Sequence, residues 1–541
     1  MLHPAVYNTS EICHAAGVRH AVMSPGSRNA PLIISFARNE KIKKWIIPDE
    51  RSAGFIALGI AQKTNAPVVL CCTSGTALLN YAPAIAEAFY REIPLIVLSA
   101  DRPPELIDQR DGQTIRQFEV LTNHVKCSAQ LPVIGDESDA EKYESTLIDS
   151  LSETSVLPLG PIHINIPFRE PFYPENGQQL SFKKPSFRIN QPTESKVDFP
   201  KTLFSKILLL IGQQPFDEQL RHELEKQAKK IPITQSPLNN LGISGIKHYD
   251  LFIQDQADLQ PELLITSGLS VVSKRLKNYL RKNKPMEHWH FDPAGVALDT
   301  FQTNPKIIKA SLTDFLAQCV LNTSDEYLDK WKNLDSETGT VLQSVDHEQF
   351  SETAAFQNVL SSLPDNLELH LSNSMPVRFA EIFGVRAGIN TWANRGASGI
   401  DGVTSTALGT SLVSDRLNVL LIGDLAFLYD RNAFFHNHPY PNLRIIVFNN
   451  SGGGIFRLID GPSNLPELEA YFETRHKRTA EHICKENSIE YCTAKDETEL
   501  LEEIELFFDQ SESPKLLEIF TNPVTNQQSY LALLKEVKDV L

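Results

Sequence analysis

Two polar residues that follow apolar runs in the last third of the sequence could bind a metal ion. Asp424 follows Val419–Ile422 after one glycine, and Asn450 follows Ile445–Phe448 after one asparagine. Short apolar runs bounded by Gly and Asn are typical of buried parallel strands, whose carboxyl ends meet at one edge of a sheet. A carboxylate, an amide oxygen and a backbone carbonyl form a hard oxygen set that suits Mg²⁺, which commonly completes its shell with phosphate and water. The spacing therefore predicts one crevice that holds a diphosphate.

The alternative is that both segments are ordinary turns. Gly-Asp after a strand is common, and Asn-Asn-Ser-Gly has good turn chemistry. If the two runs are parallel strands, a crossover must connect them, and Tyr429–His436 can begin its helix. The two turns by themselves leave both interpretations open.

A carboxyl group near the amino terminus precedes what should be a buried helix. Glu50 follows the apolar run Trp45–Ile47, and Phe55–Ala61 has the composition of a helix packed in the core. A lone Glu at a strand end is usually solvated or caps a helix. Because the helix after it would be anchored in the core, Glu50 is a candidate functional carboxyl at the helix start.

The composition is that of an ordinary globular protein with an acidic surface. The net charge of −16 argues against a nucleic-acid or anionic-membrane surface, although a cleft can still hold arginines for anions. The seven cysteines are scattered without zinc or disulfide spacing, and no apolar segment reaches ~18 residues. We expect a cytoplasmic protein with no inserted membrane segment.

The chain is long enough for several domains, because 541 residues at ~150 per domain predict three or four. In the first third, apolar strands such as Val68–Cys72 end in polar loops such as Thr73–Thr76, and Ala82–Tyr90 has the spacing of a helix on a sheet. This pattern is typical of βαβ units. We expect an α/β fold of three doubly wound parallel-sheet domains at 1–180, 195–330 and 350–541, with a polar linker at 175–200 and an acidic, helical-looking linker at 322–352.

Two further segments contain positively charged side chains. Asn394–Gly402 is a glycine-rich loop containing Arg395, which fits an anion cradle and equally a tight strand-to-helix turn. Lys274–Lys284 is basic, and because the central region has no Gly-x-Gly-x-x-Gly motif, this segment is typical of a solvated helix face. Neither segment identifies an anion by itself.

Taken together, these motifs resemble the thiamine-diphosphate decarboxylase and carboligase superfamily over essentially the whole chain. That superfamily has a Gly-Asp-Gly signature followed some 25 to 30 residues later by Asn-Asn, and Leu425 replaces its second glycine here. Ser24–Leu32, Ala100–Leu106 and Asn394–Gly402 resemble one family within it, the 2-succinyl-5-enolpyruvyl-6-hydroxy-3-cyclohexene-1-carboxylate synthases of menaquinone biosynthesis, which also carry Gly-Asp-Leu. The departure at Leu425 therefore supports the narrower resemblance.

The resemblance implies an enzyme that decarboxylates 2-oxoglutarate on thiamine diphosphate and adds the succinyl-semialdehyde carbanion equivalent to isochorismate in a 1,4 sense. It implies Mg²⁺, or Mn²⁺ in its place, and a homodimer or homotetramer, because the cofactor lies between domains of two subunits. Glu50 would hydrogen-bond the aminopyrimidine ring and act in catalysis. The cofactor site would comprise Glu50, Ile400, Gly423, Asp424, Leu425, Asn450, Gly452 and Ile455, with Asp424, Asn450 and the Gly452 carbonyl as metal ligands.

The substrates carry two carboxylates each, so a site rich in arginine is expected, since the guanidinium fork binds carboxylates bidentately. The resemblance places Ser374, Arg378 and Arg395 around the oxoglutarate-derived part and Phe456 with Ile455 in the apolar wall. It places Ser27, Arg28, Arg102, Gln113 and Lys274 around isochorismate.

Two other functions fit the sequence less well than this reaction. Another thiamine-diphosphate carboligase, such as one that forms acetolactate, fits less well because no flavin-type glycine motif is present and the arginine strings are. A non-catalytic relative kept as a binding protein would be expected to have lost Glu50, Asp424 or Asn450, and all three are present.

Overall fold

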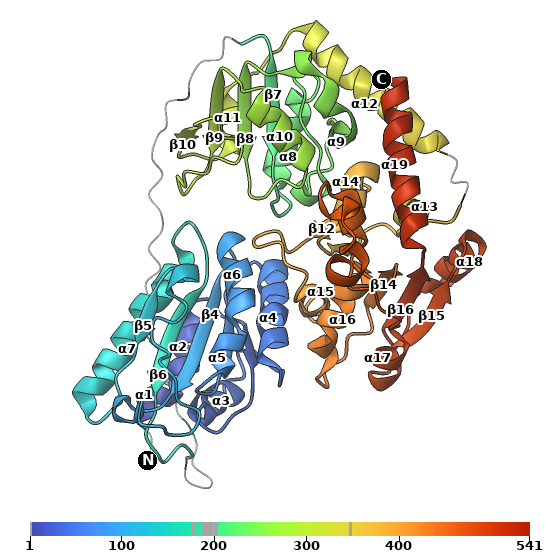
Figure 1. Cartoon of the computed structure of the whole chain (residues 1–541). Helices are drawn as coiled ribbons and strands as arrows, with labels where there is room; N and C mark the ends of the chain where they lie inside the picture. Colours follow the sequence, from blue (N-terminus) through green and yellow to red (C-terminus); the bar gives the residue numbers. More distant parts are fainter. Residues whose placement is uncertain (1–2, 175–179, 181, 186–198, 200–203, 346–348) are drawn as a thin grey trace. The chain divides into compact units, whose positions relative to one another are not determined.

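The computed structural model of this protein contains three parallel sheets, each flanked by helices (Figure 1). The structure describes residues 3–174, 180, 182–185, 199, 204–345 and 349–541. The chain divides into two compact units, one of residues 1–194, 394–415 and 429–440 and the other of residues 195–393, 416–428 and 441–541. The three sheets confirm the predicted α/β class. The exact domain boundaries stay a prediction, and the linker predicted at 175–200 lies largely outside the described residues.

The first sheet has the strand order β2-β1-β3-β4-β6-β5, and all its strands are parallel. Its strands are β1 (His20–Met23), β2 (Lys43–Ile46), β3 (Val68–Cys72), β4 (Leu95–Asp101), β5 (Ser128–Gln130) and β6 (Ile162–Pro167). The helices of this unit are α1 (Pro4–Tyr7), α2 (Thr9–Ala15), α3 (Ala30–Ala37), α4 (Glu50–Thr64), α5 (Ala77–Asn80), α6 (Ala82–Tyr90), α7 (Glu137–Ser152) and α15 (Val403–Ser411). Apolar side chains of α1, α2, α3 and α7 share one core with the sheet. The bounds of α6 confirm the helix predicted there.

Helices α4 and α15 lie side by side in direct backbone contact. A Cβ at Gly59 would come within 2.1 Å of the Thr406 carbonyl oxygen, and one at Gly409 within 2.1 Å of that of Ile56. Thr410 Oγ1 donates to the Gly59 carbonyl at 3.1 Å. Only glycine permits so close an approach, so these residues fix the spacing of the two helices.

The second sheet has the order β10-β9-β8-β7 and is buried on both faces. Its strands are β7 (Ile207–Ile211), β8 (Leu263–Ser267), β9 (Glu287–Phe291) and β10 (Lys306–Ile308), and its helices are α8 (Glu218–Gln227), α9 (Tyr249–Phe252), α10 (Lys274–Lys282), α11 (Leu312–Gln318) and α12 (Asp325–Ser344). The acidic stretch predicted as a linker at 322–352 is largely α12. Because Tyr327, Trp331 and Leu334 are buried in the core beside this sheet, α12 is a packed helix rather than an exposed connector.

The third sheet has the order β12-β11-β13-β14-β16-β15. Its strands are β11 (Glu368–Leu371), β12 (Asn390–Trp392), β13 (Asn418–Gly423), β14 (Leu443–Asn449), β15 (Glu490–Ala494) and β16 (Lys515–Phe520), and its helices are α13 (Glu352–Ser362), α14 (Met375–Phe383), α16 (Asp424–Tyr429), α17 (Glu481–Glu486), α18 (Glu497–Phe507) and α19 (Pro523–Val540). Strands β13 and β14 are parallel neighbours, with Gly423 opposite Phe448. Their carboxyl ends therefore meet, as the sequence predicted.

The crossover between β13 and β14 differs from the prediction. The helix begins at Asp424, directly after the strand, and ends at Tyr429, whereas Arg431–Phe434 forms a short 3-10 turn. The predicted start of a helix at Tyr429–His436 is therefore wrong. The adjacent Asp430 carboxyl is committed to the start of α15, where it accepts from the Ser405 N–H at 2.7 Å and pairs with the Ser405 hydroxyl at 2.9 Å.

Candidate active site

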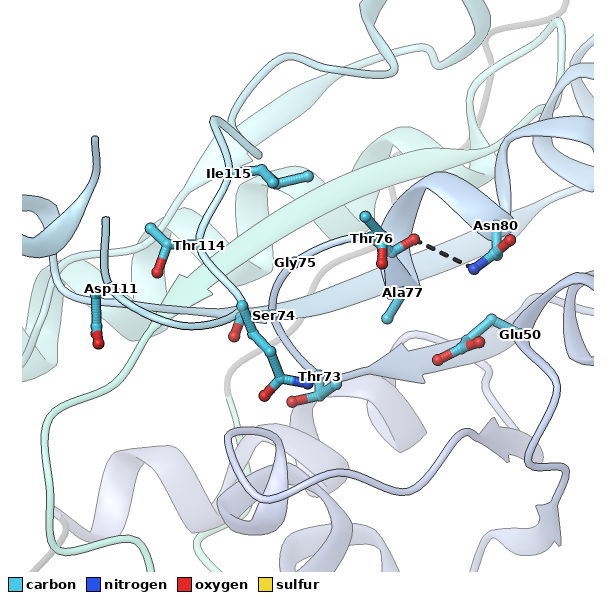
Figure 2. A pocket seen from close by; sticks show the side chains of 11 residues that line it. Glu50, Thr73, Ser74, Gly75, Thr76, Ala77, Asn80, Asp111, Thr114 and Ile115 are labelled. Carbon is cyan, nitrogen blue, oxygen red and sulfur yellow. Dashed lines mark hydrogen bonds between the residues drawn. The ribbon is translucent and has the colours of Figure 1, made fainter. Parts of the chain in front are cut away.

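In the first unit, Glu50 lines a cavity of about 290 Å³. Glu50 is the first residue of α4, and Asp49 caps that helix by accepting from the Ser52 N–H at 3.1 Å. Glu50 and Asn80 lie on one side of the cavity, with Asp111 and Thr114 on the other (Figure 2). The polar loop after β3 and the first residue of α5 provide the wall formed by residues 73–77.

The Glu50 carboxyl is half-buried, and desolvation raises its pKa above the ordinary value. The neighbouring Asp49 carboxylate raises it further, whereas a backbone hydrogen bond lowers it. A carboxyl whose pKa is raised in this way holds its proton closer to neutral pH, as proton donation to a bound ring nitrogen requires.

Gln113 lines the same cavity, and Arg102 lies against its wall. The Arg102 guanidinium donates to the Gly112 carbonyl at 2.8 Å and lies 3.4 Å from the Asp111 carboxylate. A buried polar network supports this loop, since Gln117 accepts from the Gly75 N–H at 2.7 Å and donates to Asn165 at 2.9 Å.

Ser27 and Arg28 do not line this cavity. Ser27 is exposed, and Arg28 is buried with its guanidinium 4.4 Å from the centre of the Phe172 ring and an N–H donated to the Phe168 carbonyl at 3.1 Å. Their loop still adjoins the cavity, because a Cβ at Gly26 would fall 2.4 Å from that of Thr73. A role for both residues at the substrate stays a prediction.

The loop that carries Arg395 and Ile400 is fixed within the first unit by a buried carboxylate. Glu87 on α6, only 2% exposed, accepts from the Gly396 N–H at 2.8 Å and from the Ala397 N–H at 2.7 Å. Ile400 is 41% exposed, which leaves it available to contact a ligand.

The end of this loop lies beside α4. Gly402 has a φ of +70°, and a Cβ there would overlap the Phe55 ring at 2.0 Å. The amino-terminal turns of α4 and α15 are therefore adjacent, so Glu50 and the Ile400 loop belong to the same end of one helix pair.

In the second unit, Asp424 and Asn450 lie at the meeting carboxyl ends of β13 and β14. Asp424 is 3% exposed, and its two oxygens accept from the Leu425 N–H at 2.6 Å and the Gly452 N–H at 2.9 Å. Among the described residues, the buried Asn450 Oδ1 atom has no hydrogen-bond partner. Such an orphaned oxygen beside a buried carboxylate fits a hard cation, because buried polar atoms normally have partners.

Asp424 and the Asn450–Gly452 turn are thus brought together, but the Gly452 N–H faces Asp424, and the Gly452 carbonyl accepts from the Gly454 N–H at 3.1 Å. The described residues contain no group of three His, Cys, Asp or Glu side chains placed to hold a metal ion. The predicted set differs in type, since it combines one carboxylate, one amide oxygen and the Gly452 carbonyl. Gly423 and Leu425 flank Asp424 and are only partly buried.

Sequence reasoning missed two groups behind these ligands. Glu352, at the start of α13, is 5% exposed and accepts from Asn450 Nδ2 at 3.4 Å. Burial raises the pKa of the Glu352 carboxyl to about 8, the Asn450 hydrogen bond lowers it, and the Asp424 charge raises it. Ser351-Glu352 reads in sequence as an ordinary helix start, so no sequence signal marks this carboxyl.

His476 is the second missed group, with its Nε2 atom 3.3 Å from Asp424 Oδ2. Its Nδ1 atom accepts from the Arg478 N–H at 3.0 Å, which places the ring proton on Nε2. The backbone N–H of His476 donates to the Ser451 carbonyl at 3.1 Å, so the chain around His476 packs against the Asn450–Gly452 turn.

A second cavity, of about 400 Å³, brings together Lys274, Arg378 and Ile455. Lys274 begins α10, and Arg378 on α14 donates to the carbonyl of Ser374. Desolvation lowers the pKa of Arg378. Ser374 has a φ of +77°, which is strained for a non-glycine residue and is the kind of backbone found at functional sites.

Charged and polar groups that sequence reasoning missed also line this cavity. Arg275 lies 3.4 Å from the Asp250 carboxylate, and Tyr530 of α19 lies near both Arg275 and Arg378. Phe456 packs 5.7 Å from the Phe472 ring centre and does not line the cavity, whereas its neighbour Ile455 does. Arg395 belongs to the first unit and Arg378 to the second.

Comparison with known proteins identifies relatives over nearly the whole chain. Residues 9–120 match the model "Thiamine pyrophosphate enzyme, N-terminal TPP binding domain", and residues 243–371 match "Middle domain of thiamine pyrophosphate". Proteins named 2-succinyl-5-enolpyruvyl-6-hydroxy-3-cyclohexene-1-carboxylate synthase are similar at 41% identity from Cytophaga hutchinsonii, covering 99% of each chain, and at 39% from Flavobacterium johnsoniae, covering 99% of this chain and 100% of that one. The protein of that name from Porphyromonas gingivalis is 37% identical over 93% of this chain and 92% of its own. No helix in the described ranges is long and apolar enough to cross a membrane.

Proposed function

Because this chain belongs to the family of 2-succinyl-5-enolpyruvyl-6-hydroxy-3-cyclohexene-1-carboxylate synthases, we propose that it decarboxylates 2-oxoglutarate and joins the remaining four-carbon unit to isochorismate by 1,4-addition, releasing CO₂. The observation that carries the proposal is the similarity to synthases of that name along nearly the full length of both chains. It favours this reaction over that of an acetolactate-forming relative.

The chain is a thiamine-diphosphate enzyme, thiamine pyrophosphate being the same compound. When bound, the cofactor supplies the electron sink that makes decarboxylation accessible. We propose that Asp424, Asn450 Oδ1 and the Gly452 carbonyl hold the Mg²⁺ or Mn²⁺ ion that binds its diphosphate. The buried, unpartnered Asn450 oxygen beside the Asp424 carboxylate supports this assignment.

Glu50 would hold and return the proton at the pyrimidine nitrogen. Its position at the start of α4, its place in a cavity and its raised pKa support that role. Ile400, exposed at the same end of the α4–α15 pair, would support the cofactor from below. Gly423, Leu425 and Ile455 complete the proposed cofactor contacts.

The residues proposed to bind substrate lie in both units. In the second unit, Arg378 and Lys274 would bind substrate carboxylates, because both line one cavity whose wall includes the apolar Ile455. Ser374 would orient Arg378 through its carbonyl. In the first unit, Gln113 lines the cavity, and Arg102 contacts Gly112 and Asp111 of the loop that carries it.

Ser27, Arg28, Arg395 and Phe456 are proposed from resemblance and position in their loops. The homodimer or homotetramer and the cytoplasmic location also remain predictions from the sequence.

The test combines purified protein with thiamine diphosphate, Mg²⁺, 2-oxoglutarate and isochorismate, and follows CO₂ release together with isochorismate consumption. Both should occur in equal amounts and stop when the metal is chelated. Cofactor binding without turnover of this substrate pair, while pyruvate is consumed, would overturn the proposed reaction in favour of another carboligase.

A further inference from the structure

We propose that Glu352, held by Asn526, is a positioning residue that turns the Asn450 amide so that its oxygen faces the metal. The inference rests on the metal site of the proposed function. It goes beyond that site because neither residue would itself touch the metal or the cofactor.

An amide side chain has one oxygen that can bind a cation and one nitrogen that cannot. Rotation by half a turn exchanges the two at almost no change in shape, so the orientation must be fixed by neighbouring groups. Asn450 Nδ2 faces the Glu352 Oε2 atom at 3.4 Å, and Oδ1 has no partner in the part of the chain that the structure describes. The reverse orientation would set the amide oxygen against a carboxylate oxygen.

Glu352 is itself held in place by Asn526 of α19. The Asn526 Oδ1 atom accepts from the Glu352 N–H at 2.8 Å, and its Nδ2 atom lies 3.5 Å from Glu352 Oε2 and 2.9 Å from Thr521 Oγ1. Oε2 therefore faces two N–H donors. It serves as the acceptor whether or not the other oxygen of the carboxyl carries a proton, so the orientation is independent of protonation.

A helix-capping role alone does not account for this arrangement. Ser351 already caps α13 through its hydroxyl, which accepts from the Ala354 N–H at 3.3 Å. Burying a carboxyl is costly, and an exposed one would serve the helix start equally well. The structural role predicts a loss of stability on substitution, whereas the positioning role predicts a loss of metal affinity that depends on the residue at position 450.

The test measures Mn²⁺ affinity by electron paramagnetic resonance of the free ion, using the full chain saturated with thiamine diphosphate. Four proteins are compared: wild type, Glu352→Gln, Asn450→Asp and the double variant. Glutamine can present either an oxygen or a nitrogen to Asn450, so Glu352→Gln should weaken Mn²⁺ binding by about 10-fold, at the lower end of the usual effect of losing an outer-shell partner. In the Asn450→Asp background the two ligand oxygens are equivalent, so the same substitution should cost nothing.

Glu368→Gln is a matched control, since Glu368 is a fully buried glutamate at the amino end of β11, where it accepts from Trp392 Nε1 at 2.7 Å. It should leave Mn²⁺ affinity unchanged. Asn526→Ala should weaken binding in the same direction as Glu352→Gln, and it decides the matter if Glu352→Gln does not fold. Equal losses in the Asn450 and Asp backgrounds, or none in either, would overturn the inference. Absence of cofactor-dependent Mn²⁺ binding in the wild type would instead overturn the proposed metal site, and with it this inference.

Discussion

The carboxylate of Glu87 should control how often the Arg395–Ile400 loop opens. Glu87→Gln removes the charge and keeps the shape of the side chain. Wild-type Glu87 offers one charged oxygen to each of two backbone N–H groups, at 2.8 and 2.7 Å. Glutamine offers a single oxygen and sets its NH₂ group against the other N–H.

The expected size follows from these two contacts. A hydrogen bond to a charged group contributes about 1.5–3 kcal/mol, and one of the two is lost. Local opening of the loop should therefore become roughly 10- to 150-fold more frequent, at about 1.4 kcal/mol per tenfold change.

The assay is hydrogen exchange of peptides that cover residues 394–402, read by mass spectrometry without cofactor. Exchange should accelerate in Glu87→Gln and not in Glu11→Gln, a buried glutamate of α2 that accepts from Lys41 Nζ at 2.6 Å. Unchanged exchange in this loop would show that other contacts hold it and would refute the reasoning.

Four other substitutions test single groups by separate measurements. Glu50→Gln should still bind thiamine diphosphate, but exchange of the cofactor C2 proton should slow by ~10²–10⁴-fold, since glutamine cannot pass a proton; wild-type exchange by NMR would place the activating acid elsewhere. Asp424→Ala should abolish the Mg²⁺ dependence of cofactor affinity in calorimetric titration while far-ultraviolet circular dichroism stays the same, and retained dependence would rule out this ligand. Arg378→Ala should reduce the preference for 2-oxoglutarate over pyruvate, measured as a ratio of kcat/KM, by about 10- to 100-fold, because the distal carboxylate loses a charge-assisted hydrogen bond; an unchanged ratio would contradict the assignment. Burial raises the pKa of Asp430 from 3.8 to about 7, so between these pH values the folded protein keeps a proton on this carboxyl that the unfolded chain loses. The stability that this proton contributes is therefore lost as pH rises from about 4 to about 7. Asp430→Asn should flatten the fall of Tm over that pH range, and an equally steep fall would assign the effect to other groups.

Local patterns in the sequence predicted the strand ends well. The two apolar runs before Asp424 and Asn450 are adjacent parallel strands, and Glu50 begins a buried helix. In each case a few consecutive residues are enough for the prediction, because the pattern of apolar residues and the turn residues that end it lie within a short stretch of sequence.

The partners of these residues could not be predicted in the same way. Glu352 meets Asn450 across 98 positions of sequence and Asn526 across 174. The acidic α12 looked like a linker because most of its residues are charged or polar, and its few aromatic anchors are recognisable only once the sheet they cover is known. Similarly, the crossover after β13 was misplaced because Asp430 is committed to α15 rather than to continuing a helix.

The backbone contact between α4 and α15 has a consequence for how variable the enzyme can be. The separation of Glu50 from the Ile400 loop depends on hydrogen atoms at Gly59 and Gly409 rather than on side chains that could adjust. One added methyl group at either glycine would push the helices apart, whereas large changes in the cavity that Arg378 lines in the second unit would leave their spacing untouched. Substitutions can therefore alter that cavity while the position of Glu50 relative to the Ile400 loop stays constant.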